Sequence, residues 1–216
     1  MPAPFGPASD SLLRGGLAMI LLSVVGIPLF LMVWVRTPWV TGQDIPVAQP
    51  IAFDHRHHVS DDAIGCLYCH DLAVRSPSAG IPPTGRCLNC HSQIWSESPE
   101  LAGVWRSYLT GARIAWRRVH QLPDFVYFDH SIHVGKGIGC ESCHGRVDRM
   151  ARIYQVAPLT MSWCLDCHRN PEPHLRPLER ITAMGWKPDR PQREVGLELM
   201  NEYDVRSITN CTACHR

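Results

Sequence analysis

The sequence predicts a fold with few and short α-helices and little other regular structure, joined to one N-terminal transmembrane helix. Three observations predict it. A pentapeptide with two cysteines and a histidine occurs five times in 216 residues. The chain contains 18 prolines and 16 glycines, which interrupt it too often for long helices or a large sheet. An uncharged segment of 21 residues lies near the N-terminus, and this length spans a bilayer as a helix.

Each pentapeptide has the pattern C-x-x-C-H, the attachment signature of c-type haem. Two cysteines three positions apart can form thioethers with the two vinyl groups of one porphyrin, and the histidine becomes the proximal ligand of the iron. The predicted attachment cysteines are Cys66, Cys69, Cys87, Cys90, Cys140, Cys143, Cys164, Cys167, Cys211 and Cys214. The predicted proximal ligands are His70, His91, His144, His168 and His215. The fold class is therefore a multihaem cytochrome c, in which a few short helices surround five stacked haems.

Zinc sites and disulfides are the alternative uses of paired cysteines. Zinc needs four ligands per site, and disulfides form in an oxidising compartment. Neither explains a histidine directly after every second cysteine. The net charge of +1 argues against a nucleic-acid partner.

Residues 15–36 are expected to form a transmembrane anchor, between a cytoplasmic tail at 1–14 and a linker at 37–52. A transmembrane helix tolerates Pro28, and Trp34 lies where an aromatic belt is expected. A cleaved signal peptide is the alternative, but the apolar run exceeds a usual h-region and no A-x-A-like site follows it. Because c-type haem is attached outside the cytoplasmic membrane, we expect a single-pass protein of the inner membrane with its haem domain in the periplasm.

The body contains an internal duplication. The pattern F-D-H-x-x-H-V occurs at 53–59, before the first two haem motifs, and again at 128–134, before the next two. Three segments follow from it. Residues 53–127 form the first two-haem module with a connecting helix, residues 128–185 form the second two-haem module, and residues 186–216 form a C-terminal segment with the fifth haem.

The surplus histidines favour bis-histidine ligation of the irons. The two histidines of each duplicated pattern are three positions apart and lie on nearly the same face of a helical turn, so they can bind two neighbouring haems. Four distal ligands are predicted in this way: His55, His58, His130 and His133.

The fifth distal ligand is less closely defined. His120 is the predicted ligand, just before the second module, and His174 or a methionine is the alternative. His57 has no counterpart in the second module, where Ile132 stands. His57 is therefore predicted to be a surface residue.

Three helical segments are expected in the body. Residues 98–111 have a capping serine, a proline at the first helical position and a terminal glycine, with Leu101, Val104, Trp105 and Tyr108 on one face. A short turn is expected within 178–184, in an otherwise extended proline-rich stretch at 171–191. A last helix is expected at 196–205.

These motifs resemble two related groups of proteins. The F-x-H-x-x-H arrangement is similar to multihaem cytochromes of the c3 and c7 types. The fuller resemblance is to the pentahaem cytochrome c subunit of alternative complex III, a bacterial quinol:electron-acceptor oxidoreductase. It covers nearly the whole chain, including the anchor, and supports His120 as a ligand. Its characteristic stretches here are 118–134, 161–169, 175–177 and 182–186.

The resemblance implies an electron-transfer subunit with no catalytic residues of its own. Its implied partners are an iron–sulfur subunit, polysulfide-reductase-like integral membrane subunits and a monohaem cytochrome c. Electrons would pass from quinol through the iron–sulfur clusters and five haems to a periplasmic acceptor. The alternative is a membrane-anchored multihaem quinol dehydrogenase that feeds a periplasmic reductase. A reductase of its own would need an open iron, often with a proximal lysine, and every motif here ends in histidine.

Overall fold

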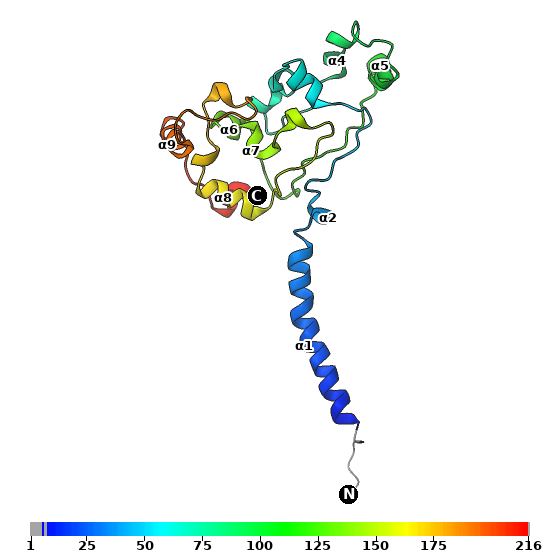
Figure 1. Ribbon diagram of the computed structural model, residues 1–216, viewed down its shortest axis with the longest axis vertical. Helices are drawn as coiled ribbons and strands as arrows, with labels where there is room; N and C mark the ends of the chain where they lie inside the picture. Colours follow the sequence, from blue (N-terminus) through cyan, green and yellow to red (C-terminus); the bar gives the residue numbers. More distant parts are fainter. Residues whose placement is uncertain (1–5, 7, 216) are drawn as a thin grey trace. The chain divides into compact units, whose positions relative to one another are not determined.

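The chain divides after Gln43 into an N-terminal unit and a body, and the elements of both are drawn in Figure 1. The computed structural model describes residue 6 and residues 8–215. Residues 1–5 and 7 of the predicted cytoplasmic tail, and residue 216 of the predicted C-terminal segment, lie outside the described residues.

Helix α1, Ser9–Trp34, has 26 residues, and none of them is buried. It begins six residues before the predicted span and includes the exposed ion pair of Asp10 and Arg14, with N and O 2.9 Å apart. Pro28 lies inside the helix without ending it. At about 1.5 Å per residue, α1 is long enough to cross a hydrocarbon layer of about 30 Å. A membrane anchor and a signal sequence share this length and composition.

Helix α2, Pro38–Thr41, is a single turn after α1. Proline begins it, and Gly42 ends it with a φ of 70°, a conformation that glycine adopts without strain. The second half of the predicted linker belongs to the body. The Asp44 N–H donates to the Gln155 carbonyl at 2.8 Å, and the Val47 N–H donates to the Ile153 carbonyl at 3.2 Å.

The described part of the body has short helices and no strand, with one isolated β-bridge between Ile138 and Leu175. Its fold is therefore the multihaem cytochrome c fold expected from the sequence. The α-helices are α3 (Cys66–Cys69), α4 (Thr84–His91), α5 (Ala102–Thr110), α6 (His130–Gly135), α7 (Cys140–His144), α8 (Met161–Arg169), α9 (Gln192–Glu202) and α10 (Cys211–Cys214). The other helical turns are the π-helix η1 (Arg56–Asp61) and the 3-10 turns η2 (Asp71–Val74), η3 (Pro99–Leu101), η4 (Val147–Arg149), η5 (Glu172–His174) and η6 (Leu178–Arg180).

Every C-x-x-C pair lies within one helical turn, in α3, α4, α7, α8 or α10. Residues three apart in a helix project from the same side, so both sulfurs of a pair face one cofactor. In α3, α7 and α10 the first cysteine begins the helix, and the residue before it is extended. These helices therefore coincide with the attachment motifs, and they are short because the motif itself is short.

The polypeptide contributes only a small hydrophobic core. The one cluster of buried apolar side chains consists, in the described residues, of Leu88, Leu101 and Val104, with Ile51 and Trp105 packed against it. It joins α4 to α5, and the Thr84 and Ser107 hydroxyls add a hydrogen bond of 2.8 Å between the same helices. Helices of one to three turns cannot bury a larger core among themselves.

The predicted helix at 98–111 is confirmed as η3 followed by α5. The Ser98 hydroxyl accepts from the Glu100 N–H at 3.3 Å, and Gly111 ends α5 with a φ of 70°. Leu101 and Val104 are buried as expected, but Tyr108 is 56% exposed. The turn expected at 178–184 is η6, Leu178–Arg180.

Helix α9 begins four residues earlier than the predicted helix at 196–205 and ends three residues earlier. Pro191, directly before it, is a favourable place for a helix to begin. Helix α9 packs on η5 through Gly196, where an added Cβ would collide with the Glu172 carbonyl oxygen. Gln192 donates to the Leu175 carbonyl at 2.8 Å and fixes the same contact.

Candidate haem-binding sites

The two duplicated segments have the same local geometry. The Phe53 ring stacks on His58, with ring centroids 4.3 Å apart and planes inclined by 26°. The same ring meets His55 edge-on at 4.7 Å. The second segment repeats this arrangement, with Phe128 at 4.4 Å and 27° from His133 and edge-on at 4.8 Å from His130. Sequence analysis assigned no role to the phenylalanine, which orients both histidines.

Three of the four predicted distal histidines of these segments use Nδ1 to donate to a main-chain carbonyl. A carbonyl oxygen only accepts, so Nδ1 must carry a proton, and in a neutral ring Nε2 then carries the lone pair. Such bonds are typical of histidines that bind a metal through Nε2. The bonds run from His58 to Asp54 (2.9 Å), from His133 to Asp129 (2.7 Å) and from His130 to Pro77 (2.8 Å).

The proximal histidines of three motifs have the same arrangement. Two of the carbonyl partners lie within ten residues after the motif, and the third comes from a distant loop. The motif alone does not predict these partners. The bonds run from His70 to Gly80 (2.9 Å), from His91 to Ile94 (3.1 Å) and from His215 to Phe125 (3.1 Å).

Three distal histidines each face one proximal histidine at nearly the same separation. An imidazole nitrogen binds a metal ion at about 2 Å and the ring centre lies roughly 1 Å further back, so two imidazoles on opposite sides of one iron have centres about 6 Å apart. The residues present therefore fit haem iron held between two histidines. The observed centroid separations are 6.1 Å for His58 and His91, 6.3 Å for His130 and His144, and 6.0 Å for His133 and His168.

His55 completes the pattern in the first module. Its Nδ1 is buried and has no hydrogen-bond partner in the described structure. Burial, followed by the neighbouring His70, lowers the pKa of His55 to about 4. His55 is therefore a neutral imidazole near His70.

The structure places His120 against the third motif. Its ring lies 4.3 Å from that of His144, and its Nε2 lies 3.3 Å from Nδ1 of His144. Burial and the neighbouring His120 and His130 lower the pKa of His144 to about 3. His215 of the fifth motif faces Phe125, with ring centroids 5.7 Å apart. The fifth distal ligand stays a prediction.

His57 and His174 lie apart from the histidine pairs. Nδ1 of His57 lies 2.8 Å from the Asp61 carboxylate, and both side chains are exposed, which confirms His57 as a surface residue. His174 ends η5, the turn that packs against α9.

None of the ten attachment cysteines forms a disulfide in the structure. Cys66 and Cys140, from the first and third motifs, are neighbours, and their interaction lowers the pKa of the Cys66 thiol and raises the pKa of the Cys140 thiol. Burial raises the pKa of Cys143 to about 12.

Arg176 is a buried cation beside the third motif. Its guanidinium donates to the Ala183 carbonyl at 2.9 Å and lies 3.9 Å from the Glu141 carboxylate. It also lies over the Trp186 ring, 5.5 Å from its centroid, a cation–π contact. Glu141 is the first variable residue of the third motif, so Arg176 fixes that motif to the proline-rich segment.

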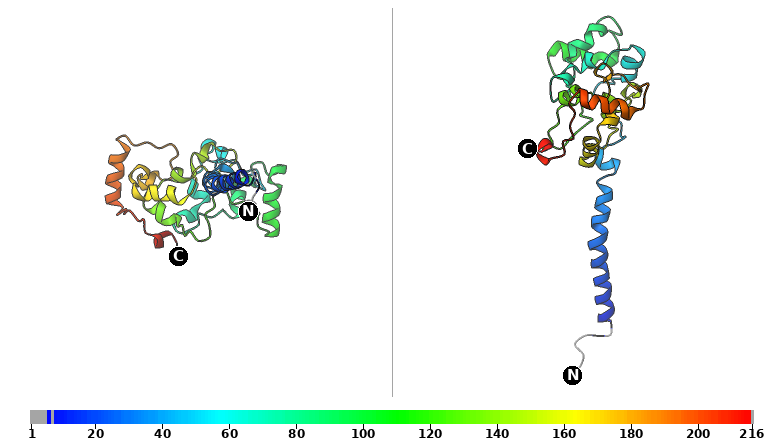
Figure 2. Two further views of the ribbon diagram at one scale, coloured as in Figure 1. Left: turned by 90° about the horizontal axis from the view of Figure 1, so that it is seen from below. Right: turned by 90° about the vertical axis from the view of Figure 1, so that its left-hand side faces the viewer.

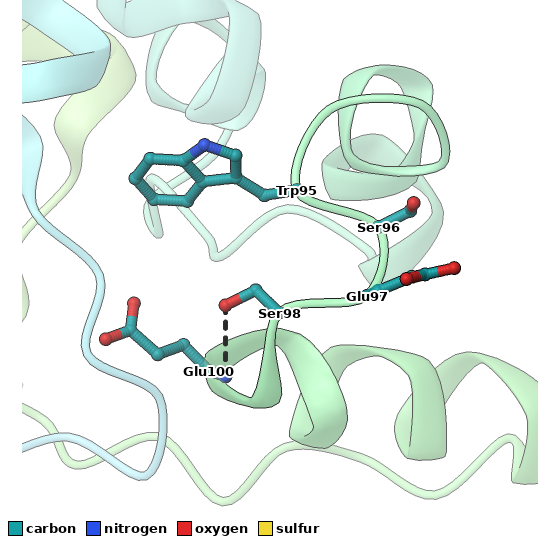
Figure 3. A pocket seen from close by; sticks show the side chains of 5 residues that line it. All are labelled: Trp95, Ser96, Glu97, Ser98 and Glu100. Atoms are coloured by element: carbon teal, nitrogen blue, oxygen red, sulfur yellow. Dashed lines mark hydrogen bonds between the residues drawn. The ribbon is translucent and has the colours of Figure 1, made fainter.

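An open pocket follows the second motif, between α4 and α5 (Figure 3). Trp95, 65% exposed, forms one side of it, and Glu97 and Glu100 make it acidic. Trp95 has a φ of 56°, which a bulky residue rarely adopts.

Comparison with known proteins identifies the family. The family described as cytochrome c7 and related cytochrome c matches residues 126–216. The chain is also 37% identical over 170 residues to the multihaem cytochrome c subunit of menaquinone reductase from Nitratidesulfovibrio vulgaris. This match covers 78% of the chain and 77% of that protein. The chain therefore belongs to the family of multihaem cytochrome c subunits that includes this relative, and its residues 126–216 form a cytochrome c7-type domain.

Proposed function

We propose that this chain is the pentahaem electron-transfer subunit of a quinone-linked membrane complex. The observation that carries the proposal is the recurrence of one histidine pair, with centroids 6.0–6.3 Å apart, at the second, third and fourth motifs. Bound haem supplies one-electron oxidation and reduction of its iron. The chain holds each porphyrin through two cysteines, orients the axial imidazoles through Nδ1 and occupies the positions that a substrate would need.

Five haems are proposed, one for each motif. His55, His58, His130 and His133 are four of the proposed distal ligands, and His120 is the proposed fifth. The modules at 53–127 and 128–185 each hold two haems, and the segment at 186–216 holds one. With all axial positions filled, the subunit is a relay and not the catalytic site.

The proposed complex is of the alternative complex III type. In it, an iron–sulfur subunit and polysulfide-reductase-like membrane subunits oxidise quinol, and a monohaem cytochrome c accepts the electrons in the periplasm. The resemblance of the motifs supports this direction. The relative from Nitratidesulfovibrio vulgaris carries the name of a menaquinone reductase subunit, and this name favours the opposite direction, from a periplasmic donor to quinone, as the second candidate.

Helix α1 is proposed as a retained anchor in the inner membrane, with the haem domain on the periplasmic side. Its apolar side chains are exposed all round the helix. About 25 cal/mol is gained for each Å² of apolar surface removed from water, so these side chains favour lipid over water.

The direction can be tested on the complex that purifies with this chain. Reduced quinol with oxidised monohaem cytochrome c should give rapid cytochrome reduction if the first proposal holds. Reduced cytochrome with menaquinone should give quinol if the second holds. Purification of the chain alone, with no quinone-reactive partner, would contradict both.

A further inference from the structure

We infer that the five attachment motifs form one linear series in space, in the order second, first, third, fourth, fifth. The inference rests on the proposed relay function and gives the path that electrons take between the haems. Along the series one electron moves at a time, and each transfer oxidises one iron as it reduces its neighbour. The second and fifth motifs are then the two ends at which electrons enter and leave.

The second motif contacts the first. The Asn89 amide, inside the second motif, donates to the Tyr68 hydroxyl, inside the first, at 3.0 Å. The Arg86 guanidinium lies over the Tyr68 ring, 5.5 Å from its centroid, and 3.7 Å from the Asp71 carboxylate next to the first motif. Arg86 also donates to the Tyr68 carbonyl.

The first motif meets the third at the junction of the two modules. Residues of the two motifs contact one short segment, since the Cys140 N–H donates to the Ile181 carbonyl at 2.9 Å and the Cys66 sulfur lies 4.0 Å from the Thr182 carbonyl. Both cysteines are points of attachment, so the porphyrins of the first and third motifs would lie side by side here.

A second set of contacts supports the same junction. Helix α6 of the second module packs on η2, which directly follows the first motif. Both N and Nδ1 of His130 donate to the Pro77 carbonyl, at 3.2 and 2.8 Å. The Ser60 hydroxyl, beside the distal histidines of the first module, donates to the Asp148 carbonyl at 2.6 Å. The distal histidine of the third motif is therefore held by the loop after the first.

The third and fourth motifs share helix α6, whose His130 faces His144 and whose His133 faces His168. The fifth motif joins at the fourth. The Tyr127 N–H donates to the Cys214 carbonyl at 2.8 Å, and the next residue, Phe128, stacks on His133.

The two ends of the series are also the most open motifs. Cys90 of the second motif and Cys211 of the fifth are the two exposed cysteines of the ten. In Figure 1 and in the right-hand view of Figure 2, helix α4 lies near the top of the body and the red C-terminal segment lies near its lower edge. Partners can approach these two motifs, whereas the cysteines of the first and third motifs are only partly exposed.

The order can be tested on the full-length protein with all haems attached. A ruthenium photoreductant is bound to a thiol introduced by Ser207→Cys, an exposed position four residues before the fifth motif. Two matched double variants each remove one haem: Cys66→Ala with Cys69→Ala, and Cys87→Ala with Cys90→Ala. Rapid photoreduction is followed by absorbance and by EPR of freeze-quenched samples.

The series predicts different results for the two variants. Loss of the second haem should leave four haems that are all reduced rapidly, whereas loss of the first should leave one of the remaining four oxidised on that timescale. The reverse pattern, which the order along the sequence predicts, would overturn the inference. Failure of any haem beyond the labelled end to take an electron would instead overturn the relay function itself.

A second measurement tests the order if the variant without the first haem does not fold. His58→Met raises the potential of the second haem, so this haem takes up an electron early in a redox titration. The order predicts that this electron lowers the potential of the haem of His55 and His70 and leaves that of His130 and His144 unchanged. A shift in the haem of His144 alone would contradict the order.

Discussion

At the residue scale, the sites depend on how each imidazole is held as much as on which histidines are present. Nδ1–H bonds to main-chain carbonyls fix the rings of His58 and His133, and the stacked Phe53 and Phe128 hold them from the side. The histidines themselves could be predicted from the sequence, because the duplicated pattern repeats them. Carbonyl partners such as Pro77 and Gly80 could not, because any residue supplies a carbonyl and only folding brings it close.

His58→Ala should open the iron of the second motif, and His57→Ala should not. The two residues are adjacent, but His58 faces His91 whereas His57 is exposed and paired with Asp61. We expect His58→Ala to keep all its haems and to bind carbon monoxide at one of them when reduced. His57→Ala should retain the low-spin spectrum of the unmodified protein. Equal carbon monoxide binding by both variants would rule out this assignment.

His120→Ala tests the least certain ligand. If His120 is the fifth distal ligand, one haem becomes high-spin and binds carbon monoxide, while every haem remains attached. Because the His120 ring lies against His144, the spectrum of the third haem should be compared between the variant and the unmodified protein. An unchanged low-spin spectrum would transfer the assignment to His174 or a methionine.

At the scale of single elements, a helix can be predicted from the sequence when the residues that begin and end it lie within the segment itself. Ser98, Pro99 and Gly111 mark both ends of η3 and α5, and the structure agrees. The sequence predicts the start of α9 four residues too late. The contact of α9 with η5 through Gly196 is long-range, and the prediction treats Pro191 as part of an extended chain. The π-helix η1 in the first copy, against the α-helix α6 in the second, shows that equal motifs fold into different turns.

Gly196→Ala should destabilise the body, because its Cβ would collide with the Glu172 carbonyl, which is main chain and cannot rotate away. Overpacking of this kind costs about 1–3 kcal/mol. Gly103→Ala in α5 is the matched control, since its Cβ would meet only the flexible Ile51 side chain at 3.3 Å. Chemical denaturation followed by circular dichroism should show a lower midpoint for the first variant and little change for the second.

Helix α1 should remain part of the mature protein and keep it in the membrane after an alkaline carbonate wash. None of its residues is buried, and transfer of its apolar side chains from water to lipid is favourable. N-terminal sequencing of the purified protein provides the measurement. A mature N-terminus after Val35 would identify the segment as a signal peptide.

At the scale of the whole molecule, two copies of one module and an added motif produce a single route. The duplication was visible in the sequence, but the junction between the first and third motifs was not. It depends on contacts such as the hydrogen bond of Ser60 with Asp148, which joins residues 88 positions apart. The series therefore differs from the order along the chain.

The denatured protein should retain five covalently bound haems. All ten cysteines lie in complete motifs, and thioether bonds survive unfolding. A pyridine haemochrome assay with a protein determination gives the ratio, and mass spectrometry of the intact chain checks it independently. Four or fewer haems per chain would contradict the assignment of at least one motif.

The small hydrophobic core has a consequence for how the protein is made in the cell. Ten apolar residues are buried in the described structure, and the eight that are larger than alanine contribute about 1.5–3 kcal/mol each. Ordering the backbone costs about 1–2 kcal/mol for every residue, so this core cannot fold the body by itself. Cofactor attachment must then precede or accompany folding, and an export defect or a shortage of haem should appear as rapid proteolysis of this chain and not as a pool of stable apoprotein.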